Sequence, residues 1–276
     1  MNKAEKSTVS LEVLIATMDR DSLDFLNPIF QNNSIQNHHI LVVNQTQNGS
    51  VLKSDLPNVR VINSHEKGLS KSRNLAIENA IGDICLIADD DVVYVENFET
   101  IILSAFKRLK DPDMIQFKAL NLIETPYKTY PNTSFQHSLK SIRGVMSIEI
   151  AFKREAIYTS KIRFNEWFGL GSKFQTGEEY IFSRNLIQHQ LSVYFFNAFI
   201  VKHAEHNSGK LLSSNTIVYA RAALNYCIFK NWAYIWVYKY VFFLYRNGYI
   251  NKNELNAKIK IALQGISDFK SINNGE

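Results

Sequence analysis

The sequence predicts an α/β fold: a doubly wound, mostly parallel sheet flanked by helices, followed by a C-terminal helical extension. Over the first 120 residues, short apolar runs rich in β-branched side chains alternate with amphipathic stretches. The runs are apolar at nearly every position, which is typical of strands that are covered on both faces. A strand–helix–strand order with short connections indicates parallel neighbours joined by right-handed crossovers.

The individual elements follow from the same patterns. Strands are expected at 12–17, 39–43, 59–63, 83–88, 114–120, 146–152 and 192–201. Helices are expected at 67–82, with Gly82 as the C-terminal stop, at 96–110 and at 177–190. The interval between 120 and 145 carries Pro, Asn and Ser with little periodicity, so we expect a long loop that serves as a lid or substrate loop.

The aromatic stretch 216–248 is expected to be helical because of its length and its alanine-rich first part. Only eight uncharged residues separate Lys230 from Lys239, whereas a membrane span needs ~20 apolar residues. A transmembrane helix is therefore not expected. We interpret the stretch as a buried packing helix, with a homodimer contact as one use. A helix in the membrane interface, with its lysines reaching the headgroups, is the alternative.

The composition is that of an ordinary globular protein: 276 residues, 46% hydrophobic and 21% charged. Cys85 and Cys227 lie far apart, which excludes a disulfide framework and a zinc-binding spacing and predicts a cytoplasmic location. No signal peptide is expected, because the first twenty residues lack a long apolar segment. Residues 202–276 hold ten Lys or Arg against four Asp or Glu. We interpret this surplus as a solvated helical face and expect no nucleic-acid partner.

Polar side chains stand at the carboxyl ends of the first four predicted strands, where open α/β sheets bind their ligands. These residues are Thr17–Met18–Asp19, Asn44–Gln45–Thr46, Ser64–His65 and Asp89–Asp90–Asp91. Three adjacent carboxylates repel one another, and a hard cation such as Mg²⁺ or Mn²⁺ would relieve that repulsion. An acidic turn that caps the next helix explains the same pattern.

Two further groups of residues complete the candidate chemistry. Glu178 and Glu179 open a predicted helix after Gly177. They are either partners of the helix dipole or, for one of the pair, a general base. His203 and His206 follow the last predicted strand in a polar loop, as surface residues or as contacts to a metal or phosphate.

Five segments, in order over about residues 10–210, resemble the family 2 inverting glycosyltransferases, whose nucleotide-sugar-binding α/β fold is called GT-A. They are "VLIATMDR", "KGLSKSRNLAIENAIGDICLIADDDV", "IEIAFKREAI", "FGLGSKFQTGEEYIF" and "HAEHNSG". The family's counterparts are Pro-Thr-Tyr-Asn-Arg, Gly-Leu-Ser-x-x-Arg-Asn followed by Asp-x-Asp, Asn-Met-Ala-Phe-Arg-Arg-Glu-Ala, Gly-x-Gly followed by Gly-Glu-Asp, and a late His and Ser. The ordered set is more specific than any single match.

The resemblance implies a role for each matching position. Asp91 would ligate Mn²⁺ or Mg²⁺, and Asp89 would contact the ribose or reach the metal through water. The other implied roles are nucleotide-sugar binding by Thr17, Asp19, Asn44, Arg73 and Asp90, catalysis by Glu179 as general base with Glu178 as the fallback, and metal or diphosphate contact by His203. Three departures from the family pattern are Ala16–Thr17–Met18–Asp19 for Pro-Thr-Tyr-Asn, Asn44–Gln45 for Asp-Asp, and Glu179 for Asp.

The implied activity is the inverting, metal-assisted transfer of a sugar from a nucleotide-diphosphate donor, expected to be a UDP-sugar, to a hydroxyl of a glycan or lipid-linked glycan. The implied setting is bacterial polysaccharide biosynthesis in the cytoplasm, with the inner face of the cell membrane as a peripheral contact through 216–248. The implied GT-A domain covers 1–210, with a nucleotide-sugar half at about 10–110 and an acceptor half at about 111–210, before a helical extension over 211–276.

Two other functions fit a doubly wound sheet with carboxylates at its strand ends. A metal-dependent nucleotidyltransferase would normally carry a glycine-rich, basic loop after its first strand, and "ATMDRDS" is neither. A non-catalytic nucleotide- or glycan-binding protein on the same scaffold would keep the crevice and need no general base.

Overall fold

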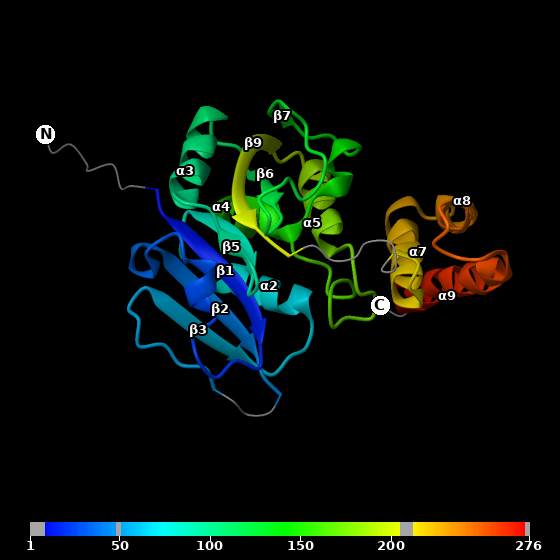
Figure 1. Cartoon of the computed structure of the whole chain (residues 1–276), viewed down its shortest axis with the longest axis horizontal. Helices are drawn as coiled ribbons and strands as arrows, with labels where there is room; N and C mark the ends of the chain where they lie inside the picture. Colours follow the sequence, from blue (N-terminus) through cyan, green and yellow to red (C-terminus); the bar gives the residue numbers. More distant parts are fainter. Residues whose placement is uncertain (1–8, 48–50, 205–211, 274–276) are drawn as a thin grey trace, which may run out of the picture. The chain divides into compact units, whose positions relative to one another are not determined.

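The computed structural model describes residues 9–47, 51–204 and 212–273 and shows two compact units (Figure 1). The first unit comprises Met1–Lys67, Lys71–Arg163 and Phe182–Glu205, and the second comprises Gly68–Ser70, Phe164–Ile181 and His206–Glu276. Residues 164–181 therefore group with the C-terminal helices, whereas the sequence-based division placed them in the first domain.

The first unit is built on a sheet with the strand order β3-β2-β1-β4-β8-β6-β9-β5, and β7 pairs with β9 outside this path. The strands are β1 (Leu11–Met18), β2 (His39–Gln45), β3 (Val59–Ser64), β4 (Ile84–Asp89), β5 (Val93–Tyr94), β6 (Met114–Leu120), β7 (Phe135–Gln136), β8 (Ile150–Lys153) and β9 (Val193–Lys202). Parallel pairing joins β3, β2, β1 and β4, as predicted. The strands β1, β2 and β4 are buried almost throughout, which explains their continuously apolar sequences.

The strand β8 interrupts this parallel order and makes the sheet mixed. It pairs antiparallel with β4 and with β6. Beyond it, β9 runs parallel to β6, and β5 and β7 form antiparallel pairs with β9. The strand expected at 146–152 begins later than predicted because a 3₁₀ turn, Ser147–Glu149, precedes β8. In this turn the carboxylate of Glu149 accepts a hydrogen bond from the backbone N–H of Met146.

Helices connect the strands and cover the sheet. They are α1 (Leu26–Ile29), α2 (Leu69–Asn79), α3 (Phe98–Arg108), α4 (Arg154–Ser160) and α5 (Glu178–Gln188), with short 3₁₀ turns at Ile35–Asn37 and Ser141–Gly144. Helix α3 shows the expected amphipathic pattern, since Phe98, Ile102, Ala105 and Phe106 on one face are buried. The interval 120–145 is mostly a loop, as predicted, with β7 and one 3₁₀ turn inside it.

The C-terminal part of the second unit packs three helices, α7 (Asn215–Phe229), α8 (Trp232–Arg246) and α9 (Leu255–Asn273), with a 3₁₀ turn at Lys252–Glu254. The stretch expected to be helical at 216–248 is thus two helices, separated at Lys230, whose backbone has φ 50° and ψ −127°. Gly265 allows α9 to approach α7 closely, because a Cβ there would lie 2.2 Å from the carbonyl oxygen of Tyr219. Within the ranges that the structure describes, no helix combines the length and apolarity of a bilayer span.

Candidate functional site

The three adjacent aspartates at the end of β4 have three different basic partners. Asp89 pairs with Arg73, Asp90 with Arg20 and Asp91 with His203. Each partner comes from a different segment of the chain. A basic side chain beside each carboxylate offsets the mutual repulsion that the sequence pattern implies.

Arg73 is the most deeply buried member of this group. Its side chain, on α2, is 2% exposed, and its Nη2 atom donates to Oδ1 of Asp89 over 2.8 Å. The side chain of Asp89 remains 30% exposed. The guanidinium therefore fixes the carboxylate from the protein side, and part of the carboxylate stays accessible to a ligand.

Asp90 connects β4 to the turn after β1. Ala16 lies opposite Asp89 in the parallel pairing of these strands, which places Thr17 beside Asp90. Oδ2 of Asp90 accepts a hydrogen bond from Oγ1 of Thr17 over 2.5 Å and from Nη2 of Arg20 over 2.7 Å. Arg20 received no role from the sequence, although it closes the segment "VLIATMDR". It is 42% exposed, so its guanidinium is available to an anionic ligand.

Asn44 shapes this turn from the interior. Its side chain is fully buried; Oδ1 accepts from the backbone N–H of Arg20, and Nδ2 donates to the backbone oxygen of Arg20 and to Oδ1 of Asn63. Asp19 is exposed and has a left-handed backbone with φ 53°. Both residues hold the turn in place, and their contact with a nucleotide stays a prediction.

Asp91 and His203 form the most open of the three pairs. Nε2 of His203 lies 3.2 Å from Oδ1 of Asp91, whose side chain is 55% exposed. The hydrogen bond with Asp91 raises the pKa of His203, and the charges of Asp91 and Asp89 add to the rise against the effect of burial. His206, the second predicted histidine, lies outside the described residues.

The donor set suits a hard divalent cation only at an open site. Among the described residues, no group of three His, Cys, Asp or Glu side chains is arranged to hold a metal ion. Mg²⁺ in enzymes commonly takes one or two carboxylates, with substrate phosphates and water as its other ligands. The exposed carboxylate of Asp91 fits that arrangement. Asp89 fits it less well, because its Oδ1 atom is engaged by Arg73.

Glu178 and Glu179 begin α5 in the second unit. Gly177 precedes them with φ 95°, and a Cβ there would lie 2.5 Å from a methyl carbon of Leu224, so glycine is required. Glu178 is 6% exposed, and its carboxyl carbon lies 3.1 Å from where a Cβ on Gly169 would stand. Glu179 is half-buried and is the more accessible of the two. The aspartates belong to the first unit, so the convergence of the two groups stays a prediction.

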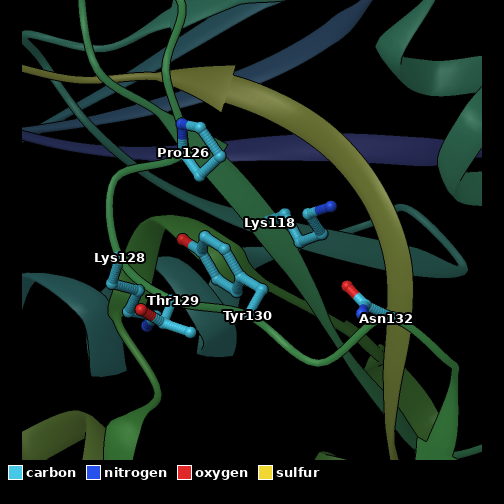
Figure 2. Close-up of a pocket in the computed structure, with 6 residues that line it drawn as sticks. All are labelled: Lys118, Pro126, Lys128, Thr129, Tyr130 and Asn132. Atoms are coloured by element: carbon cyan, nitrogen blue, oxygen red, sulfur yellow. The ribbon is translucent and has the colours of Figure 1, made fainter.

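A pocket of about 490 Å³ lies in the first unit, where the loop after β6 passes over that strand (Figure 2). Its lining residues are Lys118, Pro126, Lys128, Thr129, Tyr130 and Asn132. Glu149, fully buried, anchors this loop: its carboxylate accepts from the hydroxyl of Tyr130 over 2.5 Å and from Nζ of Lys128 over 2.9 Å. Sequence reasoning missed Glu149 because it lies inside a segment expected to be a strand.

Comparison with known proteins identifies a family for part of the chain. Residues 23–132 match the model of a family described as Glycosyl transferase family 2, and this match contains Arg73 and the three aspartates. No protein of curated function matches the sequence. The resemblance to this family is thereby confirmed over residues 23–132, which contain one of the five matching segments, the one with Arg73 and the aspartates. The turn after β1 and the residues of α5 lie outside the match.

Solved structures of S. aureus TarS 1–349 share the fold. One has a TM-score of 0.53 and 12% identity and covers 97% of this chain and 92% of its own. The complex with UDP has a TM-score of 0.53 and 13% identity, with the same coverage. The complex with UDP-GlcNAc has a TM-score of 0.55 and 14% identity and covers 94% of this chain and 80% of its own. The predicted GT-A type of fold is confirmed.

Proposed function

From the premise that this chain carries a family 2 glycosyl transferase domain with a GT-A fold, we propose that it transfers a sugar from a nucleotide-diphosphate donor to an acceptor hydroxyl with inversion. The observation that carries the proposal is the row of three acid–base pairs at the end of β4. Ligands of open α/β sheets bind at such carboxyl ends. TarS structures contain UDP or UDP-GlcNAc, which supports a UDP-sugar as the donor.

The nucleotide side of the site uses the exposed guanidinium of Arg20, which suits a diphosphate because a planar fork of donors matches phosphate oxygens. Arg73, 2% exposed, acts on the nucleotide through Asp89, which it holds from the protein side. Each arginine is already oriented by an aspartate, Asp89 or Asp90. Little side-chain entropy is then lost when the donor binds. We expect the exposed part of the Asp89 carboxylate to accept a hydrogen bond from a ribose hydroxyl.

Asp91, with His203 beside it, would hold Mn²⁺ or Mg²⁺. When bound, the ion neutralises negative charge on the departing diphosphate. The two aspartates have different roles. Asp89 is paired with Arg73 and keeps the guanidinium fixed, whereas the carboxylate of Asp91 is exposed and available to a metal ion. This division is the reason for assigning the metal to Asp91 rather than to Asp89.

Glu179 is proposed to remove the proton from the acceptor hydroxyl. A general base must come within hydrogen-bond reach of that proton, and Glu179 is more accessible than Glu178. The carboxyl group of Glu178 is buried against Gly169. The loop after β6, with its pocket, is proposed to shape the acceptor side of the site.

The proposed acceptor is a glycan carried on a lipid, and the outward face of α8 supports this choice. Its exposed apolar side chains recur every three or four residues at Trp232, Ile235, Tyr238, Phe242 and Tyr245. Exposed apolar side chains gathered on one face of a helix mark an interaction surface. The charged residues of α8 are Lys239 and Arg246, and both are exposed. Two such basic faces repel each other, so an anionic lipid surface suits α8 better than a second copy of the chain.

The activity is tested by release of UDP from UDP-sugars with Mn²⁺ in the presence of lipid-linked glycans. The wild type is compared with the Glu178→Gln, Glu179→Gln and double variants. We expect the wild type and Glu178→Gln to release UDP, and Glu179→Gln to lose about 10²–10⁴ in rate while still binding UDP. Equal rates for Glu179→Gln and wild type would show that Glu179 is not the general base. Full activity of the double variant would favour a different chemistry, and UDP binding without turnover would favour a binding protein.

A further inference from the structure

Lys118 places a positive charge in the pocket beneath the loop after β6 (Figure 2). Its Nζ atom donates to Oδ1 of Asn197 over 2.9 Å and lies 3.8 Å from the ring centroid of Phe199 and 5.8 Å from that of Tyr130. Among the described residues, no carboxylate forms an ion pair with Lys118. Partial burial lowers its pKa. An amide oxygen and aromatic faces therefore hold this ammonium without a counter-charge.

The other charges around the pocket do not supply that counter-charge. Nζ of Lys128 pairs with the buried carboxylate of Glu149 and also donates to the backbone oxygen of Gly144. Burial and the charge of Lys128 lower the pKa of His137 to about 4, so this neighbour is neutral at physiological pH. Lys128 is thus neutralised by Glu149, and Lys118 is the lining lysine that has no ion-pair partner among the described residues.

The walls of the pocket are held in place before any ligand arrives. Glu149 fixes both Lys128 and Tyr130. The Nδ2 atom of Asn197 donates to the backbone oxygen of Asn132 over 2.6 Å, and its Oδ1 atom receives Lys118. Glu149 thus anchors one part of the wall, and Asn197 anchors Lys118 and the backbone at Asn132. Preorganisation of this kind lowers the entropic cost of binding.

The same loop also passes the Asp91–His203 pair within the first unit. The ring of Tyr127 lies 5.9 Å from the ring of His203, and its hydroxyl donates to the backbone oxygen of Ala204 over 3.4 Å. Tyr127 separates Pro126 and Lys128, two lining residues of the pocket. A ligand in the pocket would thus lie along the loop that borders the proposed diphosphate site.

We propose that this pocket binds an anionic group, a phosphate or a carboxylate, that the acceptor glycan carries. Lys118 is the charged contact, and the exposed polar side chains of Thr129 and Asn132 are the neutral ones. The proposal rests on the proposed function, because it takes the acceptor to be a glycan. It deepens that function by assigning a negative charge to the acceptor.

The test measures binding of small anionic probes by isothermal titration calorimetry. The probes are inorganic phosphate, glucose 6-phosphate, glucuronate and, as the neutral control, glucose. Saturating UDP and Mg²⁺ keep the donor site occupied. The proteins are wild type, Lys118→Gln, which removes the charge, Lys118→Arg, which keeps it, and Lys107→Gln, which changes an exposed lysine of α3. A thermal melt of each variant confirms that it is folded.

We expect the wild type to bind at least one anionic probe and not glucose. Lys118→Gln should weaken that binding about tenfold to a hundredfold, as loss of a charge-assisted hydrogen bond does, and Lys118→Arg and Lys107→Gln should retain it. Phosphate against glucuronate shows which anion the pocket prefers. The proposal is overturned if no anion binds, or if Lys118→Gln binds as wild type does. The proposed function fails separately, if the protein does not bind UDP. In that case the anion titrations are carried out without UDP and test the pocket alone.

Discussion

Arg73 and Asp89 form an ion pair that joins α2 to the end of β4, with Nη2 and Oδ1 2.8 Å apart and the arginine side chain 2% exposed. A guanidinium at this depth needs its partner, because a buried charge left unpaired is costly. Asp89 therefore has a structural role, the neutralisation of Arg73, that Asp91, at 55% exposure, does not share. Two aspartates two residues apart should then respond differently to the same substitution.

Asp89→Asn should lower the free energy of unfolding by about 1–3 kcal/mol, because the charge-assisted bond to Arg73 is lost. Asp91→Asn should change it by less than about 0.5 kcal/mol, as exposed substitutions generally do. Urea denaturation followed by circular dichroism measures both values. Equal stability of the two variants would contradict the structural role of Asp89.

Asp91→Asn should instead abolish the dependence of UDP binding on Mn²⁺. The exposed carboxylate is the proposed ligand, and an amide is a much weaker ligand for a hard cation. UDP is titrated into wild type and variant with Mn²⁺ and with EDTA. We expect EDTA to weaken binding to the wild type at least tenfold and to leave the variant's affinity unchanged. If the variant keeps the full effect of Mn²⁺ on UDP binding, another residue binds the metal.

His137 should make the protein less stable in mild acid. Burial and the charge of Lys128 lower its pKa from 6.5 to about 4. Between these values the unfolded chain binds a proton that the folded chain does not, so the free energy of unfolding falls as the pH falls from about 6.5 towards 4. From pH 6.5 to 5 the loss attributable to His137 is about 1.5 kcal/mol.

The measurement compares urea midpoints at pH 6.5 and 5 for wild type, His137→Gln and His189→Gln. His189 is exposed and serves as the matched control. The acid-induced loss should be smaller in His137→Gln than in the wild type and unchanged in His189→Gln. The same loss in all three proteins would show that His137 titrates normally.

The strand ends could be predicted from sequence because they depend on local pattern. A continuous apolar run ends at Asp89 in the structure, close to the expected position. The basic partners could not be predicted in the same way. Arg20 reaches Asp90 across 70 positions of sequence because β1 and β4 are neighbours in register. The sequence indicated Arg20 only through its place in "VLIATMDR". Its pairing with Asp90 is a tertiary contact and has no local sequence pattern.

Two other features had no local signal. In the sequence, Glu149 is a polar residue that interrupts an apolar strand. Its burial is explained by Lys128 and Tyr130, which come from the loop after β6 and donate hydrogen bonds to its carboxylate. The break between α7 and α8 occurs at Lys230 without a glycine or proline. There the buried faces of two helices decide the conformation, and tertiary packing overrides local propensity.

The outward face of α8 should bind anionic lipid. Trp232 and Phe242 are 74% and 59% exposed, and Lys239 and Arg246 lie on the same exposed side of the helix. Aromatic rings favour the headgroup zone, and each basic residue near an anionic surface adds about 1 kcal/mol. The protein should therefore sediment with vesicles of phosphatidylcholine and phosphatidylglycerol and not with phosphatidylcholine alone. High salt should weaken the binding, because it screens the charges.

Two variants separate the apolar and electrostatic contributions. Trp232→Ser with Phe242→Ser should reduce sedimentation at any salt concentration, and Lys239→Gln with Arg246→Gln should remove the preference for anionic vesicles. Tyr158→Ser, at an exposed tyrosine of α4, is the matched control and should behave as wild type. If the wild type ignores vesicles and instead sediments as a dimer that the Trp232 and Phe242 substitutions dissociate, the face is a contact between two copies of the chain, and the lipid-linked acceptor loses its main support.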